Sequence, residues 1–101
     1  MNPYTIYITP EAFVEIKNLP GHVRQRIKRA VDELADQPRP ADSKALALSD
    51  ELDYAVWRLR IDKWRIIYAI TEDTKTIDVL AIRKRPPYDY RDLDGLLAKL
   101  L

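Results

Sequence analysis

Apolar and polar positions recur with two different periods along the chain, and each period predicts a different kind of element. Residues 4–8 are β-branched and aromatic, which is typical of a strand. Thr9 and Pro10 then fit the N-cap and the first position of a helix. Apolar residues recur at helical spacing over 13–19 and again over 23–34, with a Pro-Gly break between the two runs. We therefore expect two short helices joined as an antiparallel hairpin.

After a proline-rich loop at 37–43, the apolar period changes to two, which predicts strands. The predicted strands cover 54–61, 64–71 and 76–84. Two prolines end the last of them, because proline cannot donate a ladder hydrogen bond. Residues 45–53 are ambiguous, and the leucines within 91–101 are compatible with a short terminal helix.

The expected order is β-α-α-β-β-β, meaning an N-terminal strand, a helical hairpin and a three-stranded antiparallel meander. Segregated helices and strands are typical of an α+β fold, in which the helices cover one face of the sheet. The other face would then be open to solvent or to a partner. A chain of 101 residues is long enough for one domain, covering 1–101, and too short for two.

The turns between the predicted strands set which side chains share a face. A two-residue turn after the second strand places Arg60 opposite Arg65. A three-residue loop after the third strand places Arg65 opposite Arg83 and Tyr68 opposite Leu80. This register keeps the apolar residues together on the helix side, whereas a slip by one residue would mix the two faces.

The register gathers arginines on the open face of the sheet: Arg58, Arg60, Arg65, Arg83 and Arg85. Like charges directly across a sheet destabilise it, so this clustering favours a site for phosphate or another polyanion. The nearest acids, Asp62 and Asp78, are expected in a turn and on the opposite face. The charge distribution agrees with a local anion site, because residues 54–91 carry nine basic and five acidic side chains while the whole chain has a net charge of +1. The alternative is a solvated face, neutralised by an acidic protein partner.

Two tyrosines follow the last basic strand, in the sequence Arg83-Lys84-Arg85-Pro86-Pro87-Tyr88-Asp89-Tyr90. Tyrosine rings can stack on bases while guanidinium groups hold phosphates, a combination that suits single-stranded nucleic acid. The alternative is a proline-stiffened loop whose tyrosines pack on the core.

The composition excludes several other kinds of chemistry. The chain has no cysteine, a single histidine (His22) and two glycines. Disulfides, cysteine-ligated zinc, histidine-based metal sites, Ser-His-Asp triads and glycine-rich phosphate loops are therefore not expected. We expect neither a metal nor another cofactor. Without a long apolar run or a signal-peptide pattern, the expected location is the cytoplasm, with no membrane contact.

Three segments resemble the RelE/ParE superfamily of toxins from type II toxin–antitoxin modules, and the resemblance runs from Tyr4 to about Asp92. The most specific segment is WRLRIDKWRIIY at 57–68, which is similar to the family pattern yRlRvGdyRiiY. The segments LADQPRP at 34–40 and VLAIRKR at 79–85 support it. The family fold, a helical hairpin against a small antiparallel sheet, agrees with the expected one.

The resemblance implies a ribosome-dependent mRNA endoribonuclease (an mRNA interferase) that works without a metal, inhibits translation and is neutralised by a cognate antitoxin. In that reaction the 2′-hydroxyl attacks the adjacent phosphate, and fixed cations stabilise the developing charge. Arginine is a poor general base at neutral pH, so a tyrosine or a lysine is expected to move the proton. The positions that match catalytic positions of the family are Arg58, Arg65, Arg85 (with Arg83 as an alternate register) and either Tyr88 or Tyr90. The positions expected to bind RNA phosphates are Arg60, Lys63, Arg83 and Lys84.

Two positions depart from the RelE-like pattern. Val56 stands where the best-known ribonuclease has lysine, and Lys63 replaces the usual turn glycine. The chain is also less basic than typical ribosome-dependent members. These departures leave two alternatives open, a ParE-like toxin that inhibits DNA gyrase by binding and a catalytically weak homologue. In every case the expected partner is a cognate antitoxin, through which the complex would bind operator DNA.

Overall fold

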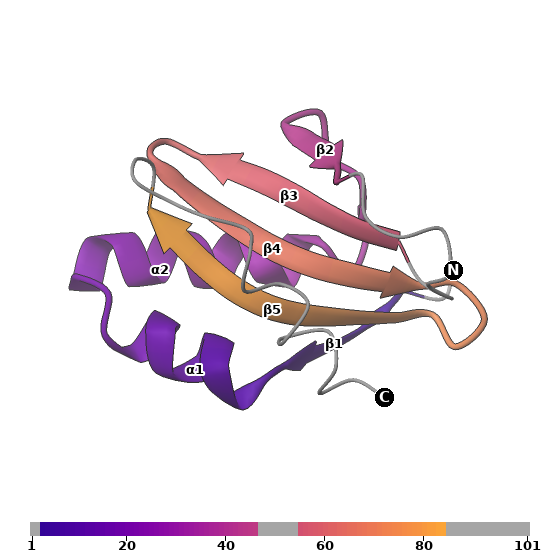
Figure 1. Cartoon of the computed structure of the whole chain (residues 1–101), viewed down its shortest axis with the longest axis horizontal. Coiled ribbons are helices and arrows are strands. Elements are labelled where there is room, and N and C mark those ends of the chain that lie inside the picture. The colour runs from indigo at the N-terminus through magenta and orange to yellow at the C-terminus, as the bar shows by residue number, and fades with distance from the viewer. Residues whose placement is uncertain (1–2, 47–54, 85–101) are drawn as a thin grey trace.

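The computed structural model describes residues 3–46 and 55–84. Its elements are β1 (Thr5–Ile8), α1 (Pro10–Lys17), α2 (Gly21–Glu33), β2 (Ser43–Ala45), β3 (Ala55–Ile61), β4 (Trp64–Thr71) and β5 (Thr76–Lys84). These strands form one sheet in the order β1-β5-β4-β3-β2, and α2 passes behind it in Figure 1. The predicted α+β fold and element order are confirmed, and the short β2 is an addition that the apolar pattern did not indicate.

The sheet is mixed because β1 pairs with β5 in parallel. The β2–β3, β3–β4 and β4–β5 pairs are antiparallel. Both helices and the whole meander separate β1 from β5 in sequence, so no tight turn constrains these two strands to run in opposite directions. The expectation of an antiparallel sheet therefore holds for the meander and not for β1.

Thr9 begins α1, as the sequence predicts. Its Oγ1 accepts a hydrogen bond from the Ala12 amide at 3.3 Å and donates one to the Val79 carbonyl at 3.0 Å. The Thr9 amide also donates to the Val79 carbonyl, at 3.1 Å. One residue therefore caps the helix and attaches its first turn to β5. This attachment places α1 along the outer edge of β5, beyond the point where β1 ends.

The main core lies between the two helices and the sheet. Alternate residues of β3, β4 and β5 point into it, as the period of two predicts. Its most deeply buried side chains include Ile27, Leu34, Ile66, Tyr68, Ile77 and Val79. The Tyr68 hydroxyl donates a hydrogen bond to the Pro38 carbonyl at 2.6 Å. That bond fixes the proline-rich loop, which leads into β2, against the sheet.

The opposite face of the sheet is buried at its centre, which corrects the prediction of an open face. Almost fully buried residues on that face are Val56, Arg65, Ile67, Ala69 and Ala81. The sequence contains the reason, because isoleucine and alanine occupy positions of β4 where a solvated face would carry polar side chains. Exposed basic side chains on this face begin near the β3–β4 turn, where Arg60 lies.

A β-bulge sets the register between β4 and β5. The loop between them has four residues, 72–75, and not the predicted three. With that loop alone, Arg65 would lie opposite Ile82. The register shift near Leu80 adds one residue to β5 and restores the predicted pair of Arg65 with Arg83.

The four-residue loop changes two predicted pairings that lie between the loop and the register shift. Tyr68 lies opposite Val79, so the predicted pair of Tyr68 with Leu80 is wrong. Asp78 lies opposite Ala69 and shares the face of the arginines, whereas the sequence placed Asp78 on the helix side. Both errors come from the loop length, because a one-residue change in register exchanges the two faces of a strand.

Candidate functional site

Two pockets meet at the end of the β3–β4 hairpin, on both sides of Arg60. The first has a volume of about 820 Å³ and the second about 410 Å³. Asp42, Arg60 and Arg65 line both of them, so we treat them as one surface, the basic groove. The charged residues that line the basic groove are Arg26, Asp42, Lys44, Arg58, Arg60, Asp62, Lys63 and Arg65. Six cations with two carboxylates make this concave surface attractive to a polyanion.

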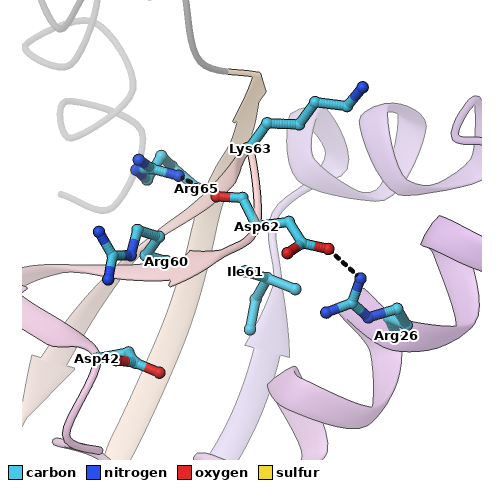
Figure 2. A pocket seen from close by; sticks show the side chains of 7 residues that line it. All are labelled: Arg26, Asp42, Arg60, Ile61, Asp62, Lys63 and Arg65. Carbon is cyan, nitrogen blue, oxygen red and sulfur yellow. Dashed lines mark hydrogen bonds and ion pairs between the residues drawn. The ribbon is translucent and has the colours of Figure 1, made fainter.

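Strand register positions the two central cations of the basic groove. Arg60 lies directly opposite Arg65, and the register predicted for the β3–β4 hairpin is confirmed over its whole length. Figure 2 shows the side chains of Arg60 and Arg65 on one side of the hairpin, while Ile61 points the other way, toward α2. Because successive side chains of a strand point to opposite faces, Arg60 faces the basic groove and its neighbour Ile61 faces the core.

Arg65 is held by the backbone of the turn and not by a carboxylate. Its side chain is buried, with 2% of the residue exposed. Its Nη1 donates hydrogen bonds of 2.9 Å to the carbonyls of Asp62 and Trp64. The guanidinium group of arginine is a permanent cation in proteins. Arg65 therefore supplies a positive charge of fixed position to the floor of the basic groove.

Asp62 closes the hairpin and joins it to α2. Its φ is 54°, in the left-handed region that Asp tolerates better than most residues. Its carboxylate forms an ion pair with Arg26 of α2, drawn as a dashed line in Figure 2. The hydrogen bond from Arg26 holds the pKa of Asp62 below its usual value. The same residue thus anchors the turn to the helix and orients Arg65 through its carbonyl.

The remaining cations of the basic groove differ in exposure. Arg60 and Lys63 are exposed and have no ion-pair partner among the described residues. Arg58 is half-buried and lies opposite Lys44 of β2, which extends the positive surface toward the sheet edge. The exposed side chains can reach a ligand, while the buried or half-buried ones keep their positions.

Two further predicted residues point elsewhere. Arg83 shares a row with Arg65 but forms an ion pair with Glu15 of α1. Lys84 lies over the ring of Trp64, with its Nζ 5.8 Å from the ring centroid. Neither lines the basic groove. The positions Arg85, Tyr88 and Tyr90, like the predicted terminal helix over 91–101, lie outside the described residues.

Sequence reasoning did not identify four residues that shape this region. Arg26 and Lys44 arrive from α2 and β2, and Asp42 comes from the loop before β2. Glu15 neutralises Arg83 from α1, although the sequence suggested that no acid would reach these arginines. Asp42 falls in the predicted loop over 37–43, and none of the four was expected near the arginines, because the linear sequence does not indicate which helix face lies against the end of a hairpin.

Within 3–46 and 55–84, no three His, Cys, Asp or Glu side chains gather in a way that could hold a metal ion. In the same part of the chain, no helix has the length and apolar character needed to cross a membrane.

Solved structures share this fold. The archaeal RelE–RelB complex from Pyrococcus horikoshii OT3 matches with a TM-score of 0.75 and 24% identity, covering 85% of this chain and 99% of that one. The RelBE2 toxin–antitoxin complex of Mycobacterium tuberculosis gives 0.68 and 21%, covering 82% and 99%. A mutant of the E. coli toxin RelE in the free state gives 0.66 and 20%, covering 98% of both chains. The chain therefore has the fold of the RelE toxins.

A sequence comparison identifies the family. The profile described as "ParE toxin of type II toxin-antitoxin system, parDE" matches residues 6–86. The chain belongs to this family, within the RelE/ParE superfamily, and is a toxin of a type II toxin–antitoxin system. None of the curated proteins matches the sequence significantly.

Proposed function

We propose that this toxin is a metal-independent endoribonuclease that cuts mRNA on the ribosome and so inhibits translation. The observation that carries the proposal is the pair of Arg60 and Arg65 at the centre of the basic groove, one exposed and one fixed in position. A phosphate diester bound at the exposed Arg60 would also be attracted by the charge of the buried Arg65, which lies directly opposite Arg60. This arrangement suits electrostatic stabilisation of a phosphoryl-transfer transition state.

The proposed step needs no cofactor. The 2′-oxygen of a nucleotide forms a bond to the adjacent phosphorus, and the bond from phosphorus to the 5′-oxygen of the next nucleotide breaks. Negative charge develops on the non-bridging oxygens, where Arg60 and Arg65 would stabilise it. The products are a 2′,3′-cyclic phosphate and a 5′-hydroxyl. One proton leaves the 2′-hydroxyl and another is delivered to the 5′-oxygen.

Proton transfer requires groups other than arginine. Within the described residues, Asp42 lines both parts of the basic groove and forms no ion pair, so it is a candidate base. Lys63 is exposed at the rim and is a candidate acid. Tyr88 and Tyr90 remain candidates from the family pattern. Val56, at the position of the family lysine, is apolar and buried and can take no part.

A cognate antitoxin is the proposed inhibitor. The similar structure from Pyrococcus horikoshii OT3 is a RelE–RelB complex, and the one from Mycobacterium tuberculosis is the toxin–antitoxin complex RelBE2. An acidic antitoxin segment lying over the basic groove would exclude RNA by charge and by shape. Operator DNA would then be bound through the antitoxin and not through this chain.

The test is expression of the toxin without an antitoxin, followed by sequencing of RNA 5′ ends. Growth arrest with new 5′-hydroxyl ends inside translated frames supports the proposal. The Arg58→Ala, Arg60→Ala and Arg65→Ala variants should lose the ends, while Arg29→Ala, an exposed arginine of α2 outside the groove, should keep them. Arrest without cleavage contradicts the proposal.

Inhibition of DNA gyrase by binding is the second candidate, and the family profile favours it because it is described as ParE toxin. A binding toxin needs a complementary surface and no proton transfer. Its signature is stabilised DNA breaks with unchanged RNA ends. Asp42→Asn separates the two functions, since it should abolish a cleavage that uses this base and leave binding to gyrase intact.

A further inference from the structure

The ion pair between Glu15 and Arg83 joins α1 to the outer edge of β5. Glu15 uses both carboxylate oxygens, because one accepts a hydrogen bond from the Ile82 amide at 3.0 Å and the other pairs with Arg83. β1 pairs with β5 only as far as Val79, so among the described residues no strand covers the edge at the Ile82 amide. One carboxylate therefore satisfies a backbone donor and binds a guanidinium at the same edge.

The backbone places Arg83 where it could join the basic groove. Arg83 lies directly opposite Arg65, which lies directly opposite Arg60, so the three arginines form one row across β5, β4 and β3. Directly opposite residues of a sheet share a face and have neighbouring Cβ atoms. The position of Arg83 is thus that of a third cation in the row, and its side chain is turned to α1 instead.

The contact between Glu15 and Arg83 is strong enough to choose this direction. The side chains are 20% exposed for Arg83 and 31% for Glu15, so water screens the pair only partly. Arg65 and Arg83, directly opposite each other, also repel. Attraction by Glu15 and repulsion by Arg65 therefore both draw Arg83 toward α1 in the unbound protein. A polyanion seated over Arg60 and Arg65 removes the repulsion and competes with Glu15 for the same guanidinium.

We propose that Glu15 is a positioning residue that holds Arg83 outside the basic groove, and that the charge of Glu15 sets how many cations the groove presents to a single-stranded nucleic acid. The inference rests on the proposed function, because it assumes that RNA phosphates are the anions bound there. Neutralising Glu15 weakens the attraction of Arg83 to α1, so that a phosphate bound in the row can draw Arg83 toward it and gain one contact.

Glu15→Gln is the matched variant, because the glutamine oxygen still accepts from the Ile82 amide while the negative charge is gone. Binding of a fluorescent single-stranded RNA 10-mer is measured from low to high salt. Glu15→Gln should bind roughly tenfold more tightly at low salt. The slope of log K against log salt should steepen by about 0.7, the value for one more phosphate of a single strand. In an Arg83→Ala background, Glu15→Gln should change neither quantity.

Asp32→Asn controls for net charge, since it removes one negative charge from an exposed position of α2. A slope that steepens equally in Asp32→Asn, or in Glu15→Gln on the Arg83→Ala background, overturns the proposal. So does an unchanged slope in Glu15→Gln. A melting curve for each variant confirms that the fold is retained.

A chemical probe tests the positioning without RNA. Phenylglyoxal modifies accessible guanidinium groups, and peptide mapping gives the rate at each arginine. The rate at Arg83 should rise in Glu15→Gln, while the rate at the exposed Arg24 of α2 stays the same. An unchanged rate at Arg83 overturns the proposal whatever the RNA data show. If the wild-type protein binds no RNA, the proposed function is contradicted. The phenylglyoxal rate at Arg83 still tests, independently of RNA binding, whether Glu15 holds this side chain.

Discussion

Arg60 on β3 lies directly opposite Arg65 on β4, one residue pair before the turn that joins the two strands. Arg65 is buried and bonded to the turn carbonyls, while Arg60 is exposed. Two like charges at this spacing destabilise the sheet unless an anion lies between them. The pair is thus a feature that binding explains better than folding does.

Arg60→Ala should separate stability from function. Removing the exposed charge should leave the free energy of unfolding unchanged or raise it by a few tenths of a kcal/mol, because the repulsion across the pair disappears. RNA cleavage should fall by about 100-fold, the scale expected when one transition-state cation is removed. Urea unfolding and a cleavage assay on translating ribosomes measure the two effects. A stability loss as large as the activity loss would show that Arg60 has a structural role.

Arg65→Ala should damage the fold as well as the activity. The variant leaves the carbonyls of Asp62 and Trp64 without their donor in a partly buried place, at a cost of about 1 kcal/mol. Urea unfolding should show this loss for Arg65→Ala and not for Arg60→Ala. Equal stability of the two variants contradicts the assignment of Arg65 as the fixed member of the pair.

Tyr68→Phe tests how the proline-rich loop is held. The variant keeps the buried ring and removes the hydrogen bond to the Pro38 carbonyl, so the free energy of unfolding should fall by about 1 kcal/mol. Burial raises the pKa of Tyr68, so the hydroxyl remains a donor over the whole neutral range. Tyr7→Phe is the control, because 57% of Tyr7 is exposed. If both variants unfold at the same urea concentration, the bond does not hold the loop.

Asp78→Asn should change how stability depends on pH. Burial raises the pKa of Asp78 above its ordinary value of 3.8, so the folded state disfavours the charged form. The folded state then holds its proton at a pH where the unfolded state has lost it, and stability falls as the pH rises from about 3.8 through the raised pKa. Asp78→Asn should therefore be more stable than the wild type at neutral pH, with a difference that shrinks on acidification. Unfolding midpoints at several pH values measure it, and a difference independent of pH contradicts this account.

Local chemistry predicted much of the fold. Thr9 begins α1 because threonine followed by proline is a strong helix start, and the β3–β4 register follows from a two-residue turn. The β4–β5 pairing was only partly predictable. The four-residue loop shifts the register by one residue, and the bulge at Leu80 shifts it back. The predicted pairs, such as Arg65 with Arg83, therefore form only on the side of the bulge away from the loop.

The sequence predicted the residues that β3 and β4 contribute to the candidate site. It did not predict those that come from α2, from β2 or from the loop before β2. A period of two and a two-residue turn together place Arg58, Arg60 and Arg65 on one face, whatever covers that face. The ion pairs of Arg26 with Asp62 and of Glu15 with Arg83 depend on how the helices cross the sheet. Arg26 and Asp62 are 36 residues apart in the sequence, and Glu15 and Arg83 are 68 apart. No short-range sequence pattern predicts such pairs.

The most direct test of the central claim compares RNA 5′ ends in cells that express the wild type or Arg60→Ala without an antitoxin. If the basic groove cleaves mRNA, the wild type should produce 5′-hydroxyl ends within translated frames, and Arg60→Ala should produce about 100-fold fewer at equal protein levels. Growth arrest by the wild type with no new RNA ends, or equal cleavage by both proteins, would contradict it.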